Sequence, residues 1–321
     1  MMDKDIVFNY KYIEKYFDIG SLDTYKKTCN YFKSEFDVLE KIEESICFLD
    51  NKVIKFFYNK KKNLDRIERL QYLNNLTPKI LAVSENFHSM EFINSKPLSK
   101  IYQSGIIYKL LKWTHTNLWS LDVNIDINLF QESCIKFYKD KTLSRIKKGL
   151  EEKSIVDCTK INGSFIEDIY SLLNKLDYSF LSDGKPGYFH GDFILDNILM
   201  KNEEFILIDW RENFGENKEY GDIYYDLAKL RHNIFFNHEN IGNELFEIRL
   251  ENDNAIVDMK CNFFLINQID EFEKFVREYN YDLRKIKILT SLIWINMAPL
   301  HSYPLSNFLF NLGKYNLFLC L

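Results

Sequence analysis

The stretch from Gly187 to Leu230 constrains this chain more than any other part of it. It reads G-Y-F-H-G-D-F-I-L-D-N-I-L-M, then F-I-L-I-D-W, and finally Y-G-D-I-Y-Y-D-L-A-K-L. Asp192 could accept a proton from an attacking hydroxyl group. The side-chain oxygens of Asn197 and Asp209 are of the kind that Mg²⁺ prefers. We therefore interpret this stretch as a candidate phosphoryl-transfer site.

The residues between Asn197 and Asp209 predict a β-hairpin. An apolar run at 198–200 is followed by polar residues at 201–204 and by a second apolar run at 205–208. Because a hairpin folds back on itself, a residue just before its first strand and one just after its second strand finish close together. Asn197 and Asp209 can therefore share one ion.

The order of these motifs resembles that of a known family. His190-Gly191-Asp192, with Asn197 five positions on and Asp209 after the hairpin, is similar to the H-R-D-x-x-x-x-N and D-F-G motifs of protein kinases. The G-D in place of R-D, together with the later G-D-x-x-x-D-L-A at 221–228, resembles the aminoglycoside phosphotransferase and choline kinase family more closely. A competing interpretation makes the aspartates turn and cap residues and His190 a packed histidine.

The resemblance implies an α+β, two-lobed protein-kinase-like fold, in which a small N-terminal lobe has an antiparallel sheet plus a helix and a larger C-terminal lobe is mostly helical. The expected lobes are residues 1–94, which bind the nucleotide, and residues 95–321, which carry the catalytic and acceptor sites. Residues 1–35 would form a helical extension of the first lobe. The two lobes would hold the nucleotide between them.

The family also implies an activity. ATP, with GTP as an alternative, would donate its γ-phosphate to a hydroxyl group of a small molecule such as an aminoglycoside, choline or another amino alcohol, or a sugar. Asp192 would act as the catalytic base, Asn197 and Asp209 would bind Mg²⁺, and His190 would brace the loop. Two alternatives stay open, namely a pseudokinase-like module that binds nucleotide without turnover and a metal-dependent phosphoesterase.

The N-terminal part offers a candidate phosphate-binding lysine. Lys55 interrupts the apolar run from Val53 to Phe57, and Val53-Ile54-Lys55 is similar to the V-A-I-K strand of kinases. Otherwise Lys55 would lie on the solvated face of a hairpin, and Lys52 would be its competitor on the opposite face. Glu68 is the glutamate that could orient Lys55 from the next helix, and Asp65 could replace it in another register.

The segment Met90-Glu91-Phe92-Ile93 is expected to link the lobes. By resemblance, its backbone would bind the adenine, which assigns cofactor-binding roles to Glu91 and Ile93. The chain has no glycine between Gly20 and Gly105, so the glycine-rich phosphate loop of kinases has no counterpart.

Hydrophobic spacing predicts the remaining elements. Strands are expected from Phe36 to Phe57 around a turn at 50–51, at Ile80–Val83 and at His88–Ile93. Helices are expected at Tyr10–Phe17, Leu22–Phe32, Leu64–Leu76, Ile107–Leu118, Leu129–Phe137, Lys141–Leu150, Phe165–Leu176, Leu283–Met297 and Leu305–Leu317. Asp226 is expected to start or cap a helix through Arg231, with a carboxylate that could bond backbone amides of the catalytic loop.

The acceptor site is less well specified. Lys141, Arg145 and Lys148 recur at helical spacing, which is typical of a solvated face, with contact to a substrate phosphate as the alternative. The acidic stretch 239–275 would suit a cationic acceptor, although surface helices are commonly acidic. The break that carries His301 and Tyr303 could line the acceptor pocket, with core packing as the default.

Composition excludes some classes of function. A net charge of -5 over 321 residues gives no basic footprint for a nucleic acid, so we expect no nucleic-acid partner. The scattered cysteines, the lack of a secretory signal and the lack of an apolar run long enough to span a bilayer favour a cytoplasmic protein with no membrane partner. The oligomeric state is not constrained.

Overall fold

The computed structural model describes residues 43–321 apart from 50, 102, 261 and 262, together with 16, 21, 23 and 24. The helices expected at 10–17 and 22–32, the extension at 1–35 and the start of the strand region at residue 36 therefore lie outside the described residues.

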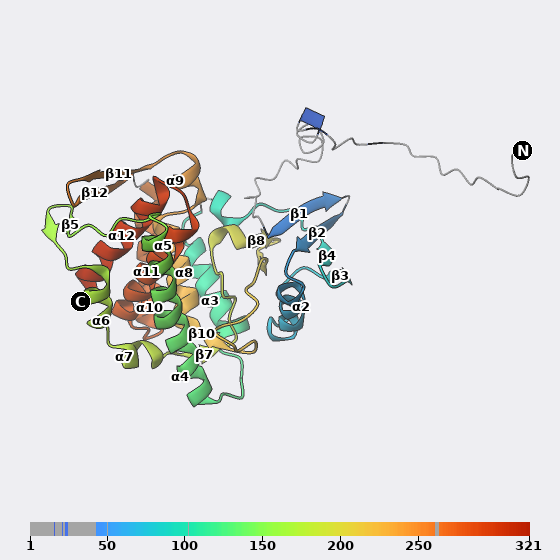
Figure 1. The fold of residues 1–321 in the computed structure, drawn as a ribbon. Helices are drawn as coiled ribbons and strands as arrows, with labels where there is room; N and C mark the ends of the chain where they lie inside the picture. Colours follow the sequence, from blue (N-terminus) through green and yellow to red (C-terminus); the bar gives the residue numbers. More distant parts are fainter. Residues whose placement is uncertain are drawn as a thin grey trace, which may run out of the picture.

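The N-terminal lobe is built on an antiparallel sheet with strand order β1-β2-β4-β3 (Figure 1). The strands are β1 (Glu44–Leu49), β2 (Lys52–Phe57), β3 (Ile80–Val83) and β4 (Phe87–Glu91). β1 and β2 pair in antiparallel register with Leu49 opposite Lys52, which agrees with a reversal of the chain between them. β4 ends at Glu91, earlier than expected, because the chain leaves the sheet there and crosses to the second lobe.

Helix α2 (Lys60–Glu68) follows β2 and continues as the 3₁₀ turn η1 (Arg69–Tyr72). The side chain of Asn59 caps it by accepting a hydrogen bond from the amide of Lys62 at 3.3 Å. The helix expected at Leu64–Leu76 begins earlier in the chain, and of its predicted apolar stripe Leu70, Leu73 and Leu76 pack on the core while Leu64 does not. Leu64 is exposed, whereas the polar face of α2 is buried. This face points inward because it finds ionic partners there.

The C-terminal lobe is mostly helical (Figure 1). Its longer helices are α3 (Ile106–Thr114), α4 (Ile127–Ile135), α5 (Lys141–Glu151), α8 (Ile223–Phe235), α10 (Phe263–Glu278), α11 (Leu283–Met297) and α12 (Leu305–Cys320). Its shorter helices are α6 (Ile169–Asn174), α7 (Tyr178–Ser182) and α9 (His238–Gly242). Its π-helical turns are η3 (His115–Trp119) and η4 (Lys136–Asp140). Its 3₁₀ turns are η2 (Leu98–Lys100), η5 (Leu195–Asn197) and η6 (Ala298–Leu300). Helix α11, with the predicted bounds, is the buried centre of the lobe, packed against α12 and α8.

Two small sheets shape the site. The predicted hairpin after Asn197 is confirmed as β8 (Ile198–Lys201) and β9 (Glu204–Leu207), which pair in antiparallel register. β7 (Pro186–Gly187) and β10 (Gly221–Asp222) pair on either side of the catalytic loop and close its ends together.

A further sheet in the C-terminal lobe corrects two expectations. β11 (Phe246–Glu251) and β12 (Asn254–Met259) form a hairpin where acidic surface helices were expected, and β5 (Lys160–Ile161) with β6 (Ser164–Phe165) extends it. The helix expected at Phe165–Leu176 is therefore only the short α6. Its first residue belongs to β6 because the sheet captures the chain at this point.

The architecture is thus the expected α+β, two-lobed protein-kinase-like fold. In the part of the chain that the structure describes, no helix has the length and apolar character required to cross a membrane.

Candidate active site

Helix α8 holds the loop that carries Asp192 in place. The carboxylate of Asp226 accepts hydrogen bonds from the amides of His190 and Gly191, both at 2.7 Å, and from the indole of Trp119 at 3.2 Å. This confirms the expectation that Asp226 binds the amides of this loop. Asp226 does not cap α8, however, because Asp222 occupies the N-cap and accepts from the amide of Tyr224 at 3.0 Å.

His190 braces the loop, as expected, and does not face a reacting group. Its Nε2 lies 2.9 Å from the carbonyl oxygen of Ile208, and its Nδ1 accepts a hydrogen bond from the amide of Asp192 at 3.2 Å. This pattern requires the neutral ring with its proton on Nε2. Burial lowers the pKa of His190 to about 4, which keeps the ring neutral. The histidine therefore joins the catalytic loop to the end of the β8–β9 hairpin.

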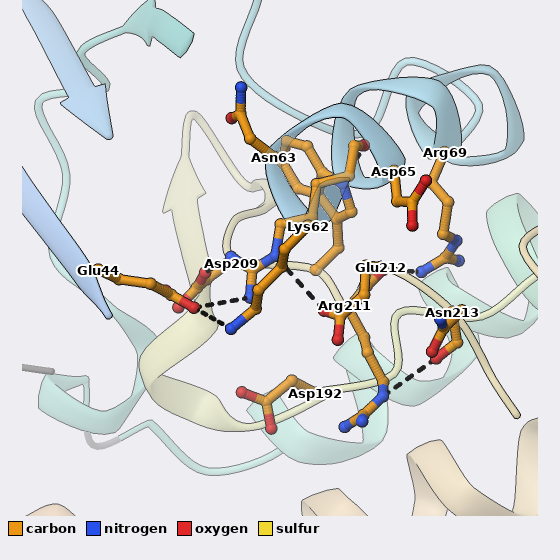
Figure 2. A network of polar contacts seen from close by, with 12 residues as sticks. Glu44, Lys62, Asn63, Asp65, Arg69, Asp192, Asp209, Arg211, Glu212 and Asn213 are labelled. Carbon is orange, nitrogen blue, oxygen red and sulfur yellow. Dashed lines mark hydrogen bonds and ion pairs between the residues drawn. The ribbon is translucent and has the colours of Figure 1, made fainter. Parts of the chain in front are cut away.

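The hairpin brings Asn197 and Asp209 together. The amide of Ile208 donates to the carbonyl oxygen of Asn197 at 2.9 Å. Asp209, the residue after Ile208, therefore leaves the hairpin next to Asn197. The side-chain nitrogen of Asn197 donates to the main-chain oxygen of Asp192 at 2.9 Å and to its Oδ2 at 3.1 Å. The site residues predicted at 192, 197 and 209 thus share one place in the structure. Figure 2 shows Asp192 and Asp209 beneath helix α2.

The oxygen atoms available here fit a hard divalent cation. Because both bonds that Asn197 makes to Asp192 use its nitrogen, its Oδ1 is left for an ion, and Asp209 adds a carboxylate. No group of three or more histidine, cysteine, aspartate or glutamate side chains is arranged to hold a metal among the described residues. A magnesium ion bound by these two residues would take its remaining ligands from phosphate oxygens and water, which is usual for Mg²⁺.

Two cations from the N-terminal lobe converge on Asp209. The Nζ of Lys55, on β2, lies 3.1 Å from Oδ1 of Asp209, and a guanidinium nitrogen of Arg66, on α2, lies 2.7 Å from the same oxygen. Arg66 also lies 3.7 Å from the carboxylates of Glu44 and Glu212. Lys55 is thus placed inside the site and is buried, whereas its competitor Lys52 is exposed.

The structure does not bring Glu68 to Lys55. Glu68 is half exposed and binds Lys218 (Nζ to Oε2, 2.5 Å), and Asp65, the alternative, pairs with Lys218 at 2.7 Å and with Lys61. The inward position on α2 is occupied by Arg66. The sequence did contain a signal for this, because Arg66 lies on the opposite side of the helix from Leu64 and three residues from the buried Arg69.

The segment between the lobes starts from a buried Met90, which is 2% exposed. After Glu91, the chain passes Ile93 and pairs with the β8–β9 hairpin through a bridge between Pro97 and Leu199. Among the described residues, none accepts a hydrogen bond from the main-chain amide of Ile93. That amide could therefore bind a ligand, as the assignment of Glu91 and Ile93 requires.

Asp192 has a cationic partner that the motif analysis missed. The Nζ of Lys229, on α8, lies 2.7 Å from Oδ1 of Asp192. Burial alone would raise the pKa of Asp192, but the charge and hydrogen bond of Lys229 outweigh that effect and hold the pKa at about 2. The signal was present, since Lys229 follows Asp226 by one helical turn and so lies on the face of α8 that meets the loop.

The structure also revises the acceptor region. Lys141 and Arg145 line a cavity next to Lys229, so the expectation of a solvated face holds only for the exposed Lys148. None of the acidic residues at 239–275 lines this cavity, and neither does His301 or Tyr303.

The fold and this loop are similar to those of protein-kinase-like phosphotransferases. Residues 152–250, which include the catalytic loop, the hairpin and the start of the β11–β12 sheet, match the family model described as the phosphotransferase enzyme family, APH. This match confirms the family resemblance inferred from the motifs. No curated protein sequence matches the chain.

Solved structures with similar folds come from several kinases. They include an ethanolamine kinase from Plasmodium vivax (15% identity over 93% of this chain and 88% of that one, TM-score 0.47). The aminoglycoside phosphotransferase APH(2")-IIa, in a ternary complex with streptomycin and ATP, has 16% identity over 86% and 92% of the two chains and a TM-score of 0.48. A fructosamine-3-kinase homologue from Thermobifida fusca has 11% identity over 83% and 85%, with a TM-score of 0.48. Identities and scores this low do not decide the substrate.

Proposed function

We propose that this protein transfers the γ-phosphate of ATP to a hydroxyl group of a small molecule in the presence of Mg²⁺. The observation that carries the proposal is the convergence of Asp192, Asn197 and Asp209 on one loop and hairpin, with Lys55 bonded to Asp209. The match of residues 152–250 to the phosphotransferase family supports it.

In the reaction, the oxygen of the acceptor hydroxyl forms a bond to the γ-phosphorus while the bond from that phosphorus to the bridging oxygen breaks and ADP leaves. The hydroxyl proton passes to the carboxylate of Asp192 and then to solvent. Mg²⁺ bound by Asn197 and Asp209 would neutralise charge on the phosphate oxygens. Most of the rate would come from positioning and from charge neutralisation.

Asp192 acts mainly by orienting the hydroxyl group. A carboxylate with a pKa of about 2 is too weak a base to deprotonate an alcohol before the transfer. In a loose transition state the acceptor oxygen bonds only weakly to phosphorus, so its proton need leave only late in the step. Asn197, which bonds Asp192, and Lys229, which pairs with it, fix the carboxylate for this role.

The N-terminal lobe would hold the nucleotide. Lys55 and Arg66 bring two positive charges to Asp209, where they could also meet phosphate oxygens. The amide of Ile93 and the carbonyl of Glu91 would bind the adenine edge. GTP is the alternative nucleotide, because backbone contacts of this kind leave no side-chain signature.

Consumption of ATP with Mg²⁺ against a panel of alcohols, amino alcohols, sugars and aminoglycosides tests the proposal. Acceptor-dependent turnover should fall about 10²- to 10⁴-fold in Asp192→Asn, the usual contribution of a positioned base. Lys55→Met should lose most of the activity, while the matched control Lys52→Met, on the same strand but exposed, should keep it.

Two outcomes would contradict the proposal. Phosphate release that persists in Lys55→Met without any phosphorylated acceptor would identify a metal-dependent phosphoesterase. Nucleotide binding without turnover on any acceptor would identify a pseudokinase-like module.

A further inference from the structure

A cavity of about 170 Å³ lies beside the catalytic loop, between helices α5, α8 and α11 and the segment that follows β9. Its polar lining includes Lys141, Arg145, Arg211, Lys229 and Asn296. Lys229 links this lining to the catalytic loop, because its Nζ lies 2.7 Å from Oδ1 of Asp192. The cavity therefore opens next to the atom that would receive the acceptor proton.

Arg211 joins the cavity to the loop from the other side. Its amide donates to the carbonyl oxygen of His190 at 3.0 Å, and it packs so closely on Gly191 that a Cβ there would lie 2.5 Å from the Cβ of Arg211. A molecule in the cavity would thus touch residues that hold both ends of the H-G-D motif. This position suits the acceptor and not the nucleotide, whose expected contacts, such as Lys55, lie in the N-terminal lobe.

The cations that line the cavity outnumber the carboxylates close to it. Asp192 pairs with Lys229, and Glu212 lies near enough for its charge to act on Lys141 and Arg211. No carboxylate lines the cavity, and within the described chain none lies within ion-pair distance of Lys141, Arg145 or Arg211. The Nζ of Lys141 lies over the ring of Phe137, 3.9 Å from its centroid, and the guanidinium of Arg211 lies 4.9 Å from the same centroid. Arg145 donates only to the carbonyl oxygen of Asn296, at 2.9 Å.

Such a cluster costs free energy unless an anion offsets it. Burial, and then the nearby charges of Arg211, Arg145 and Lys229, lower the pKa of Lys141 well below its usual range. The aromatic ring of Phe137 offsets part of this cost by cation–π contact, which is worth far less than an ion pair with a buried anion. The arrangement is therefore one that a bound carboxylate or phosphate would stabilise.

Asn296, on α11, lines the cavity and is bonded within the protein. It is 8% exposed, and its side-chain nitrogen donates to Oγ1 of Thr142 at 2.6 Å and to the carbonyl oxygen of Leu292 at 2.8 Å. Its Oδ1 is buried and has no hydrogen-bond partner among the described residues. The bond from Arg145 to the main-chain oxygen of Asn296 therefore ties that guanidinium to a fixed part of the cavity wall.

We propose that the cavity binds the acceptor through an anionic group, so that the substrate is a small hydroxylated carboxylate or phosphate ester and not a cationic amine. Lys141, Arg145 and Arg211 hold the anion, and a hydroxyl group of the same molecule reaches Asp192. A volume of about 170 Å³ admits one sugar ring or a shorter polyol. This inference rests on the proposed phosphotransferase function.

Matched acceptors test it. The panel contains glycerol, glycerate and glycerol 3-phosphate, and then glucose, glucosamine, gluconate and glucose 6-phosphate. We expect kcat/KM for an anionic member to exceed that for its neutral and amino counterparts by at least about tenfold, the discrimination that one charge-assisted hydrogen bond supplies. The carboxylate and phosphate arms show which anion the cavity takes.

Variants then assign the effect to the cavity. Lys141→Gln combined with Arg145→Gln should abolish the preference for the anionic acceptor. Lys148→Gln is the matched control, because Lys148 lies on the same helix but is exposed and pairs with Glu152 at 3.8 Å. The double variant removes the repulsion between the charges of Lys141 and Arg145, so it should remain folded. Measurement of its thermal midpoint checks this. The same anionic acceptors should raise the thermal midpoint of the wild type but not that of the double variant.

The two proposals fail differently. A preference for amines, or an anionic preference that survives in the double variant, would overturn the cavity inference while leaving phosphotransfer intact. Calorimetric binding of glycerate or glycerol 3-phosphate that is lost in the double variant, with no transfer to any acceptor, would support the cavity as an anion site and overturn the proposed function. The absence of both binding and preference for every anion would overturn the inference.

Discussion

Asp209 shows how one residue can organise the contact between the lobes. Its backbone has φ +56°, in the left-handed region that aspartate tolerates better than most residues. This turn at the exit of β9 directs its carboxylate toward Lys55 and Arg66, which both bind Oδ1. A straight continuation of β9 would send the side chain elsewhere, so the local backbone conformation is part of the site.

Asp192 and Lys229 form an ion pair between the catalytic loop and helix α8. Lys229 is 12% exposed and Asp192 about one third exposed, so the pair sits at the mouth of the cavity. Because Lys229 holds the pKa of Asp192 near 2, the carboxylate should stay ionised throughout the range in which the protein is folded.

We therefore predict a pH effect in Lys229→Met. Burial would still raise the pKa of Asp192, but the cation that lowers it would be gone. The ratio of kcat/KM for the variant to that for the wild type should fall as the pH decreases from 8 to 5, which pH profiles on one acceptor would measure. Taking the ratio cancels the titration of ATP. Lys229→Arg keeps the charge and should give a flat ratio, and a flat ratio in Lys229→Met would show that Lys229 does not control this group.

At the scale of elements, α2 is attached to the opposite lobe by its polar face. Arg69 is fully buried and donates to the carbonyl oxygens of Phe189 at 2.6 Å, of Lys218 at 2.8 Å and of Arg211. Its guanidinium also lies 4.0 Å from the ring centroid of Phe189. The indole of Trp210 returns a bond to the carbonyl oxygen of Arg66 at 2.8 Å. The helix is thus fixed relative to the catalytic loop.

Arg69→Met should uncouple the lobes. The variant fills the space but leaves buried carbonyl oxygens without donors, at a cost of about 1–3 kcal/mol for each group that water cannot reach. Urea unfolding should show lower stability, and kcat should fall because Arg66 would lose its fixed position. The exposed neighbour Gln71→Met is the control. Unchanged stability and kcat in Arg69→Met would mean that the attachment does not matter.

The β11–β12 hairpin is an element that could have been read from the sequence. Its first strand, F-E-I-R-L-E, alternates apolar and charged residues. The turn residues Asn252 and Asp253 have φ values of +46° and +63°, which is the two-residue turn that such hairpins favour. The acidic residues of this segment are compatible with any exposed element, whereas the alternation with a period of two is specific for a strand.

At the scale of the whole molecule, charge is distributed unevenly. The chain is acidic, with a net charge of -5, yet lysine and arginine are the charged side chains that line its cavity. Net charge is a sum over the whole chain, so the proposed anionic acceptor depends on this local excess of lysine and arginine and not on the total.

Buried titratable groups make the stability of the fold depend on pH. Burial lowers the pKa of His88 and His190 to about 4 and that of His232 to about 3, whereas it raises the pKa of Asp222 and Asp226 to about 6. As the pH falls below about 6.5, the unfolded chain binds protons on the three histidines that the folded chain refuses, which destabilises the fold. The two aspartates bind protons first in the folded chain, which opposes this effect.

These five groups, three histidines against two aspartates, predict a net loss of stability on acidification of about 1.4 kcal/mol per pH unit between pH 6 and 4. Burial also lowers the pKa of His115 and of His301, which adds to the loss. Urea unfolding at pH 7, 6 and 5 measures it. His88→Phe keeps an aromatic ring that can stack on Phe57. The change of unfolding free energy with pH should be smaller in this variant by the contribution of one proton. Stability that rises steadily from pH 7 to 5 would contradict the assignment of neutral buried histidines.

The sequence by itself determined the parts of the site that depend on neighbouring residues. The catalytic loop followed from the order of H-G-D, Asn197, a hairpin and Asp209. The two ends of a hairpin lie close together in any tertiary context, so Asn197 and Asp209 had to meet. Asp226 was likewise expected to bind the loop amides, and it does. The strand lysine at position 55 followed from an apolar run in a strand.

Only the tertiary structure decided which faces of the helices turn inward. Glu68 and Arg66 lie two residues apart on α2, so they point to different sides of the helix. The packing of α2 on the other lobe turns Arg66 toward Asp209 and leaves Glu68 to pair with Lys218 near the surface. The cavity depends still more on long-range packing, since Lys141, Arg211 and Asn296 come from separate elements. Their shared charge and the orphaned oxygen of Asn296 arise only when the chain is folded.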